Sequence, residues 1–258
     1  MSTQTHTTRT ARVPRLYVEA RLDGPDIALA SKQAHYLRHV LRLKSGNNVV
    51  VFDGQGNECL AEIVALTRNG AELRITSTNV PIPEPELNLI LLQGVAKAEA
   101  MDLIVQKTTE LGVRSIMPVV TEFSVVKVDA QRIRHRLEHW QRIAHSACEQ
   151  SGRHSPPLIA EPQPLERGLE AVPQQSTRLV LDPAADLTFA ERVDSRRHAA
   201  PVCLLIGPEG GLSARDFLLT DKAGFERTKL GPRILRVETA AIAACTLAQA
   251  NWGDLLES

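Results

Sequence analysis

The sequence predicts an α/β protein in which a small N-terminal β-barrel precedes a larger domain with a mainly parallel sheet. Short strands of alternating polarity, separated by dipeptide turns, fill much of the first third of the chain. A proline-rich segment interrupts them, and apolar strands then alternate with helices. We expect a flexible tail over 1–12, the barrel domain over 13–80, a linker over 81–86 and the second domain over 87–258.

The elements expected in the barrel domain follow one another closely. A helix should run from an N-cap at Ser31 to about Leu41. Apolar residues alternate with charged neighbours farther along, which indicates strands with one buried face. The turns Asp53-Gly54 and Asn69-Gly70 separate three such strands, over 49–52, 59–65 and 71–75.

The second domain begins with the apolar run 87–92, which is typical of a buried strand. A helix should follow, because Met101, Ile104 and Val105 fall on one stripe and Gly112 supplies a C-terminal cap. The other expected elements are a strand over 116–120, a helix over 129–149, strands over 178–181, 202–206 and 225–230, and an alanine-rich helix over 239–252.

The composition excludes several classes of protein. Lys+Arg and Asp+Glu both number 30, so the chain has no overall basic charge, although a local basic patch for nucleic acid remains compatible. The four cysteines form no CxxC pair, which argues against a zinc ribbon or a disulfide scaffold, and no metal is expected. No apolar run approaches the ~20 residues of a membrane span, and no signal peptide is evident. We expect a cytoplasmic protein that does not bind membranes.

Two loops that follow strands carry the clearest chemical signals. The first, 206–213, places Gly207, Gly210 and Gly211 after a buried strand, where a backbone can approach a ligand closely. It matches neither a P-loop nor a dinucleotide fingerprint, and its plain alternative is a turn into a helix capped by Ser213. The second loop, 230–240, ends a strand and could start the last helix at Thr239. Together they fit the ligand crevice at the carboxyl ends of parallel strands.

A long helix within 127–153 carries a basic face. Arg132, His135, Arg136, His139 and Arg142 recur at helical spacing. Such a face is most often merely solvated, but its segregation in a chain of zero net charge also suits RNA phosphates. Arginines between the histidines would repel a metal cation.

Seven strings carry a family resemblance from about Arg15 to Trp252. They are 35–43, 52–56, Lys97 with Met101-Asp102, 106–113, 149–153, 206–211 and 230–240. In this combination and order the sequence resembles the RsmE family of ribosomal RNA methyltransferases, in the SPOUT superfamily. One departure is Phe123, where relatives often carry arginine. If that arginine holds RNA, the contact must come from elsewhere, with Lys127 as one candidate.

The resemblance implies a PUA-like RNA-binding barrel followed by a SPOUT domain with a deep C-terminal trefoil knot. It further implies a homodimer that uses S-adenosylmethionine to methylate N3 of a uridine in the decoding region of 16S rRNA, free or within the 30S subunit. The dimer contact should include the last helix around Ala244, Leu247 and Ala248. Two alternatives remain open: a SPOUT methyltransferase for another RNA atom, and a non-catalytic RNA-binding protein of ribosome assembly.

The candidate site residues fall into three groups. Arg236 should stabilise the uridine anion, unless it only pairs with Glu238 or Glu209, and the second choices for orienting the base are Glu110, Glu149 and Gln150. The cofactor-binding candidates are Leu181, Asp182, Gly207, Pro208, Glu209, Gly210, Gly211, Leu230, Gly231, Ile234, Leu235, Arg236, Thr239 and Ala240. The RNA-binding candidates are Arg15, His35, Arg38, Arg42, Lys97, Lys107, Arg132, Arg136 and Arg153.

Overall fold

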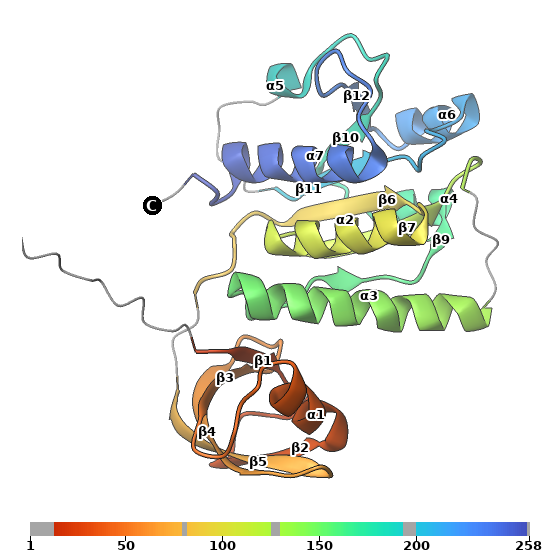
Figure 1. The fold of residues 1–258 in the computed structure, drawn as a ribbon. Coiled ribbons are helices and arrows are strands. Elements are labelled where there is room, and N and C mark those ends of the chain that lie inside the picture. The colour runs from red at the N-terminus through yellow and green to blue at the C-terminus, as the bar shows by residue number, and fades with distance from the viewer. Residues whose placement is uncertain (1–12, 79–81, 125–129, 193–199, 257–258) are drawn as a thin grey trace, which may run out of the picture. The chain divides into compact units, whose positions relative to one another are not determined.

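The chain folds into two compact units, Met1–Ile82 and Pro83–Ser258. The computed structural model describes residues 13–78, 82–124, 130–192 and 200–256 (Figure 1). The expected tail over 1–12, part of the expected linker and Lys127 lie outside these residues. No helix in the described part of the chain is long and apolar enough to cross a membrane.

The first unit is a curled sheet of five strands with one helix. Its elements are β1 (Arg15–Tyr17), β2 (Asp26–Ala30), α1 (Ser31–His39), β3 (Asn48–Phe52), β4 (Glu58–Leu66) and β5 (Gly70–Thr78). The strand order is β1-β3-β4-β5-β2, and only the β1–β3 pair is parallel. α1 packs against β5 and β2 and covers a core in which Leu37, Val51 and Leu73 are fully buried.

The structure differs from the expectations for this unit in two places. β2 was not predicted, although its residues alternate between buried and exposed, because only Ile27 and Leu29 mark its buried face. Ser31 is the first helical residue and not the cap; Ala30 occupies the N-cap position, without a side-chain hydrogen bond, and the helix ends at His39.

The second unit alternates strands and helices. Its elements are β6 (Leu89–Gly94), α2 (Ala98–Glu110), β7 (Ser115–Val120), α3 (Ala130–Ser151), β8 (Leu158–Ile159), β9 (Gln163–Pro164), α4 (Leu165–Glu170), β10 (Thr177–Leu181), α5 (Phe189–Arg192), β11 (Val202–Ile206), α6 (Ala214–Lys222), β12 (Glu226–Thr228) and α7 (Val237–Trp252). The sheet has the order β12-β10-β11-β6-β7-β8, with β9 beside β7, and every strand pair is parallel. This confirms the predicted fold class, while the knot remains a prediction.

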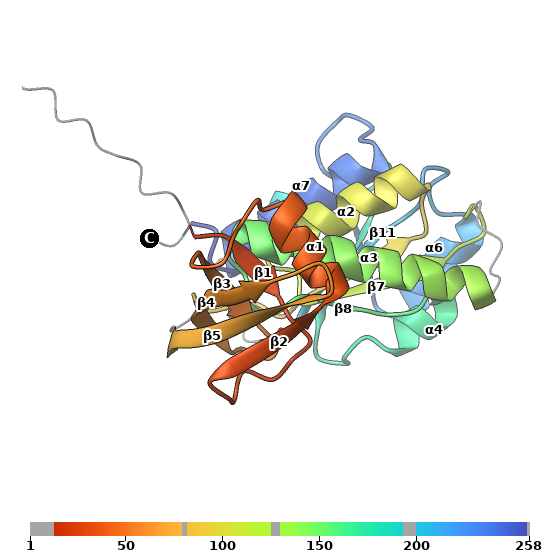
Figure 2. The same cartoon turned by 60° about the horizontal axis from the view of Figure 1, so that its bottom comes forward.

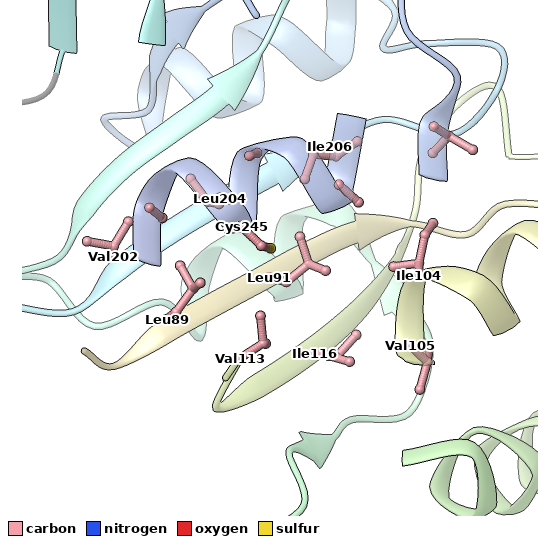
Figure 3. Close-up of a cluster of buried hydrophobic side chains, with 14 of the residues drawn as sticks. Leu89, Leu91, Ile104, Val105, Val113, Ile116, Val202, Leu204, Ile206 and Cys245 are labelled. Carbon is pink, nitrogen blue, oxygen red and sulfur yellow. The ribbon is translucent and has the colours of Figure 1, made fainter. Parts of the chain in front are cut away.

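Helices cover both faces of this sheet (Figure 2). Leu89, Leu91 and Leu204 belong to the core that α2, α3 and α7 close (Figure 3). Their neighbours Ile90, Leu92 and Leu205 belong to a second core, which α4 and α6 close. Residues that alternate along a strand point to opposite faces, so a strand buried on both faces reads as a continuous apolar run.

The last helix, α7, lies within the core of its own chain. Ala244 and Ala248 are fully buried there, so the expectation that these two residues form a dimer contact is wrong. Leu247, the third residue of that expectation, is 38% exposed. α7 also begins at Val237 with Arg236 as N-cap, so Thr239 lies inside the helix and does not cap it.

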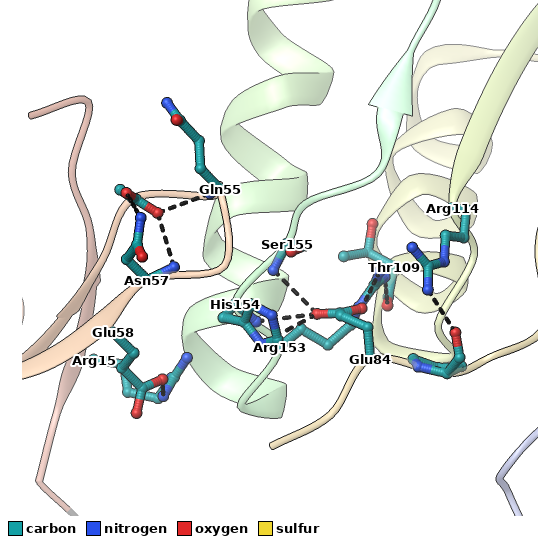
Figure 4. A network of polar contacts seen from close by, with 12 residues as sticks. Arg15, Gln55, Asn57, Glu58, Glu84, Thr109, Arg114, Arg153, His154 and Ser155 are labelled. Carbon is teal, nitrogen blue, oxygen red and sulfur yellow. Dashed lines mark hydrogen bonds and ion pairs between the residues drawn. The ribbon is translucent and has the colours of Figure 1, made fainter. Parts of the chain in front are cut away.

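A buried ion pair fixes the segment that leads into β6 (Figure 4). Arg153 Nη2 donates to Glu84 Oε2 over 2.7 Å, and both side chains are 10% exposed. Arg153 Nη1 also donates to the carbonyl oxygens of Thr109 and Val113, at 2.7 and 3.1 Å. The other oxygen of Glu84 accepts the backbone N–H of His154. This network joins the start of the unit to the ends of α2 and α3.

Candidate active site

A cavity of about 860 Å³ lies at the carboxyl edge of the parallel sheet. Five segments line it: the ends of β10 and β11 with the loops that follow them, the approach to α7 with its first turn, the first turns of α2, and Phe217 of α6. Ten of its lining residues are predicted cofactor-binding residues: Leu181, Asp182, Gly207, Pro208, Glu209, Gly211, Ile234, Leu235, Arg236 and Ala240. The two loops that the sequence singled out therefore lie in one site.

The loop after β11 turns sharply over the cavity. The N–H of Gly211 donates to the carbonyl oxygen of Pro208 over 2.9 Å, and Gly211 has a left-handed φ of +74°. A Cβ on Gly207 would lie 3.0 Å from the carbonyl carbon of Gly211. The loop then ends at Ser213, which caps α6 through a reciprocal pair of hydrogen bonds with Asp216. Ser213 is thus the cap that the plain reading of this loop predicted.

The end of β6 supports this loop from behind, and the sequence reasoning missed it. A Cβ on Gly94 would lie 2.6 Å from Cδ and N of Pro208, so only glycine permits this close approach. The fully buried Gln93 side chain donates from Nε2 to the carbonyl oxygens of Ile206 and Gly207, both at 3.4 Å. A polar residue and a glycine directly after the apolar run 87–92 were the signal that could have revealed this support.

Glu209 joins the loop to α2. Its Oε1 accepts the backbone N–H of Lys97, the N-cap residue of α2, over 2.9 Å. Lys97 itself makes no side-chain cap, so a carboxylate from another segment meets the positive end of this helix. Glu209 therefore holds two walls of the cavity together as well as lining it.

Two cationic side chains, Lys97 and Arg236, line the cavity. Arg236 is exposed, and no ion pair joins it to Glu209 or Glu238, which were its alternative partners. The structure thus leaves the guanidinium at the cavity. Lys97, which was predicted to bind RNA, lies at the same site.

The lining favours a ligand that carries positive charge. Its ionisable side chains are the two cations and four carboxylates, those of Glu99, Asp182, Glu209 and Glu238. The Asp182 side chain is nearly buried, and its Oδ1 accepts the N–H of Ala184 over 2.9 Å. Leu181, Ile206 and Leu235 add apolar surface. A sulfonium with an attached amine and a flat adenine fits this mixture; a triphosphate would be repelled.

The other predicted cofactor-binding residues do not line the cavity. They are Gly210, Leu230, Gly231 and Thr239. Gly210 faces away from it, since a Cβ there would lie 2.9 Å from Cβ of Phe123. Within the described residues, no group of three side chains could hold a metal ion.

The three second-choice catalytic residues lie away from the cavity. α2 begins beside it and runs 13 residues to Glu110, a rise of about 18 Å. Glu149 and Gln150 lie in the last turn of the 22-residue α3. Lys107 also lies in the last turn of α2, where its Nζ pairs with Glu110 at 2.8 Å. None of these side chains lines the cavity of its own chain, so we do not assign them to the base there.

Two of the predicted RNA-binding arginines hold the protein itself together. Arg15 pairs with Glu58 and lies over the ring of Phe52, 4.8 Å from its centre, with its side chain 10% exposed. Arg153 forms the buried pair with Glu84. Each guanidinium is engaged within its own unit, so we do not assign either of them to the binding of RNA.

The remaining RNA candidates lie on two surfaces. In the first unit, His35 and Arg38 line a cavity of about 380 Å³ together with His39, Thr67 and Arg68, and Arg42 is exposed just beyond α1. In the second unit, Arg132 is exposed and Arg136 partly exposed near the start of α3. His139 of the same helix is bonded to Asp102 of α2 at 2.8 Å.

Comparisons with known proteins point to one family. The model of an RNA methyltransferase domain matches residues 83–249, and that of an RNA methyltransferase PUA domain matches residues 29–76. A curated relative, the ribosomal RNA small subunit methyltransferase E of Buchnera aphidicola subsp. Schizaphis graminum, is 33% identical over 245 residues. That match covers 95% of this chain and 98% of the relative.

Two solved structures are similar along nearly their whole length. A ribosomal RNA small subunit methyltransferase E from Neisseria gonorrhoeae, bound to S-adenosyl methionine, has a TM-score of 0.86 and 34% identity, and the match covers 94% of this chain and 99% of that one. A methyltransferase from Legionella pneumophila in complex with SAM has a TM-score of 0.88 and 34% identity, covering 95% and 100%.

Proposed function

Because this chain belongs to the RsmE family of RNA methyltransferases, we propose that it methylates N3 of uridine 1498 in 16S ribosomal RNA with S-adenosylmethionine. The observation that carries the proposal is the cavity at the carboxyl edge of the sheet. It combines a glycine loop, a carboxylate-rich lining and the guanidinium of Arg236. The relatives from Neisseria gonorrhoeae and Legionella pneumophila bind this cofactor.

Different residues of the cavity would contact different parts of the cofactor. The glycine loop offers backbone groups, and Leu181, Leu235 and Ile206 offer an apolar surface for adenine. Asp182 and Glu238 offer carboxylates to hydroxyl or ammonium groups. When bound, S-adenosylmethionine would supply the methyl group from its sulfonium and leave as the thioether, and these residues would hold and orient the cofactor.

Arg236 would stabilise the charge that develops on the base. Uridine N3 must pass its proton to solvent before it can accept a methyl group, and the negative charge then spreads onto the neighbouring oxygens. A guanidinium already in place stabilises this anion without reorganising. Lys97, which also lines the cavity, is the second cation available for the same role. The target base must leave any base pair to reach them.

We further propose that the protein acts as a homodimer on 16S rRNA or the 30S subunit, in the cytoplasm. Leu103 of α2 and Leu247 of α7 are each 38% exposed on two helices that contact each other. Their burial against a second copy would remove apolar surface from water. Light scattering should give twice the 28.3 kDa mass of one chain.

Mass spectrometry of nucleosides tests the reaction directly. The protein is incubated with S-adenosylmethionine and either 16S rRNA or 30S subunits that lack the modification. We expect 3-methyluridine at one position, and the two substrates show which form of the RNA is used. A methyl group on another atom would establish the alternative SPOUT activity. Cofactor binding and RNA binding without any methyl transfer would contradict catalysis.

A further inference from the structure

Phe123 differs from every other aromatic side chain of the protein. The chain has five phenylalanines, two tyrosines and two tryptophans, and all nine lie in the described residues. Eight are buried or partly buried, whereas Phe123 is 47% exposed. It therefore offers the one open aromatic face among these nine side chains.

The position of Phe123 is fixed beside the active-site loop. It belongs to the turn after β7, where the N–H of Thr121 donates to Ser124 Oγ over 3.0 Å and the N–H of Ser124 donates to the carbonyl oxygen of Thr121 over 3.1 Å. A Cβ on Gly210 would lie 2.9 Å from its Cβ and 3.6 Å from its Cγ. Gly210 stands between two lining residues of the cavity, so the ring lies against the tip of the loop that bounds it.

The first turns of α3 carry exposed arginines at the same edge of the sheet. α3 follows β7 and begins at its carboxyl end, where Arg132 and Arg134 are exposed and Arg136 is partly exposed. The first turn of this helix holds no acidic residue. Cations at a helix N-terminus oppose the helix dipole. An exposed arginine such as Arg134 also suits the phosphates of an RNA strand.

We propose that Phe123 stacks on a base of the single-stranded RNA that enters the cavity, while the start of α3 meets the phosphates. Proteins bind single strands by this combination of an aromatic platform and a basic surface. The inference rests on the proposed function, since it concerns the same RNA. It adds a base contact outside the cofactor site that would set the path of the strand.

Fluorescence anisotropy with a labelled single-stranded oligouridine measures the contact. Phe123→Ala should weaken binding by about 5- to 150-fold, the effect of losing one stacked base. Phe123→Leu should weaken it nearly as much, because leucine keeps the bulk and loses the flat ring, whereas Phe123→Trp should bind like the wild type. Leu158→Ala is the matched control, since Leu158 is 74% exposed at the start of β8, beside the opposite end of β7.

Two further readouts separate stacking from other roles. Phe123→Ala should keep the wild-type dependence of affinity on salt, whereas Arg134→Gln should reduce it, because only the latter removes a phosphate contact. The emission of Phe123→Trp should change when RNA binds. The wild-type emission should change less, since Trp140 and Trp252 are both buried.

Several outcomes would overturn the inference. One is oligouridine affinity within twofold of wild type for Phe123→Ala, and another is wild-type affinity for Phe123→Leu. The third is a loss of dimer on light scattering with RNA affinity retained, which would make Phe123 a contact between copies. Wild-type protein that binds RNA through Phe123 but methylates none would contradict the proposed function alone. Methylation that is indifferent to Phe123 would contradict this inference alone.

Discussion

Replacement of Gly94 by alanine should displace the active-site loop without changing any residue that lines the cavity. The new Cβ would lie 2.6 Å from both Cδ and N of Pro208 and 2.9 Å from the carbonyl carbon of Gly207. Ordinary contacts begin at 3.4 Å, so the loop must retreat by about 0.8 Å. The obstructing atoms belong to a ring and to backbone, which cannot rotate aside. That shift would also break the 3.4 Å hydrogen bond from Gln93 to Gly207.

The cost should appear both in stability and in cofactor binding. Overpacking of this kind lowers the free energy of unfolding by about 1–3 kcal/mol, which corresponds to roughly 2–4 °C per kcal/mol in a chain of this size. We expect calorimetry to show about tenfold weaker binding of S-adenosylmethionine, since the loop lines its site. Gly24→Ala is the control, because its Cβ meets nothing closer than 4.0 Å. Cofactor affinity within twofold of wild type in Gly94→Ala would refute the view that β6 positions the loop.

Three other predictions concern charge and protonation. Arg236→Met should reduce single-turnover methylation by ~10²–10³-fold while cofactor affinity stays near wild type; a loss of only a few-fold would move the role to another residue. Burial lowers the pKa of His145 from its ordinary value of 6.5 to about 4. As the pH falls, the imidazole therefore takes up a proton in the unfolded chain before it does so in the folded protein. The free energy of unfolding should decrease by about 2 kcal/mol between about pH 6.5 and 4. Chemical denaturation should find a smaller decrease in His145→Gln. Burial also raises the pKa of Cys59 to about 11 and that of Cys245 to about 12, and all four thiols are buried. A thiol reagent at pH 7 should thus react with the native protein far more slowly than with the unfolded chain, as absorbance would show.

The sequence predicted most of the second unit because its signals are strong and local. Apolar runs such as 202–206 and the stripe at Met101, Ile104 and Val105 correspond to β11 and α2. Short elements escaped it: α5 has four residues and β8 two, too few for any periodicity to emerge.

The sequence predicted those parts of the site that leave a local signal. Glycine loops mark strand ends in the sequence, and Gly207 and Gly211 indeed line the cavity. The role of Gly94 depends on Pro208, more than a hundred residues away, and local patterns carry no such information. For Gly94 a role was missed, whereas for Arg153 a role was predicted that the structure does not support. A basic residue at a helix end suggested an RNA contact, but only the fold reveals that Glu84 neutralises it in a buried position.

The order of strands in the second sheet bears on how the protein is made. β6 is the first strand of its unit to leave the ribosome, yet it pairs with β11, so that Leu89 meets Val202. The centre of the sheet therefore cannot close until more than a hundred further residues have been synthesised. Contacts so distant along the chain require a long loop to close first and make folding slow. Until then, β6 and β7 expose apolar faces, so the nascent chain should depend on chaperones during this interval.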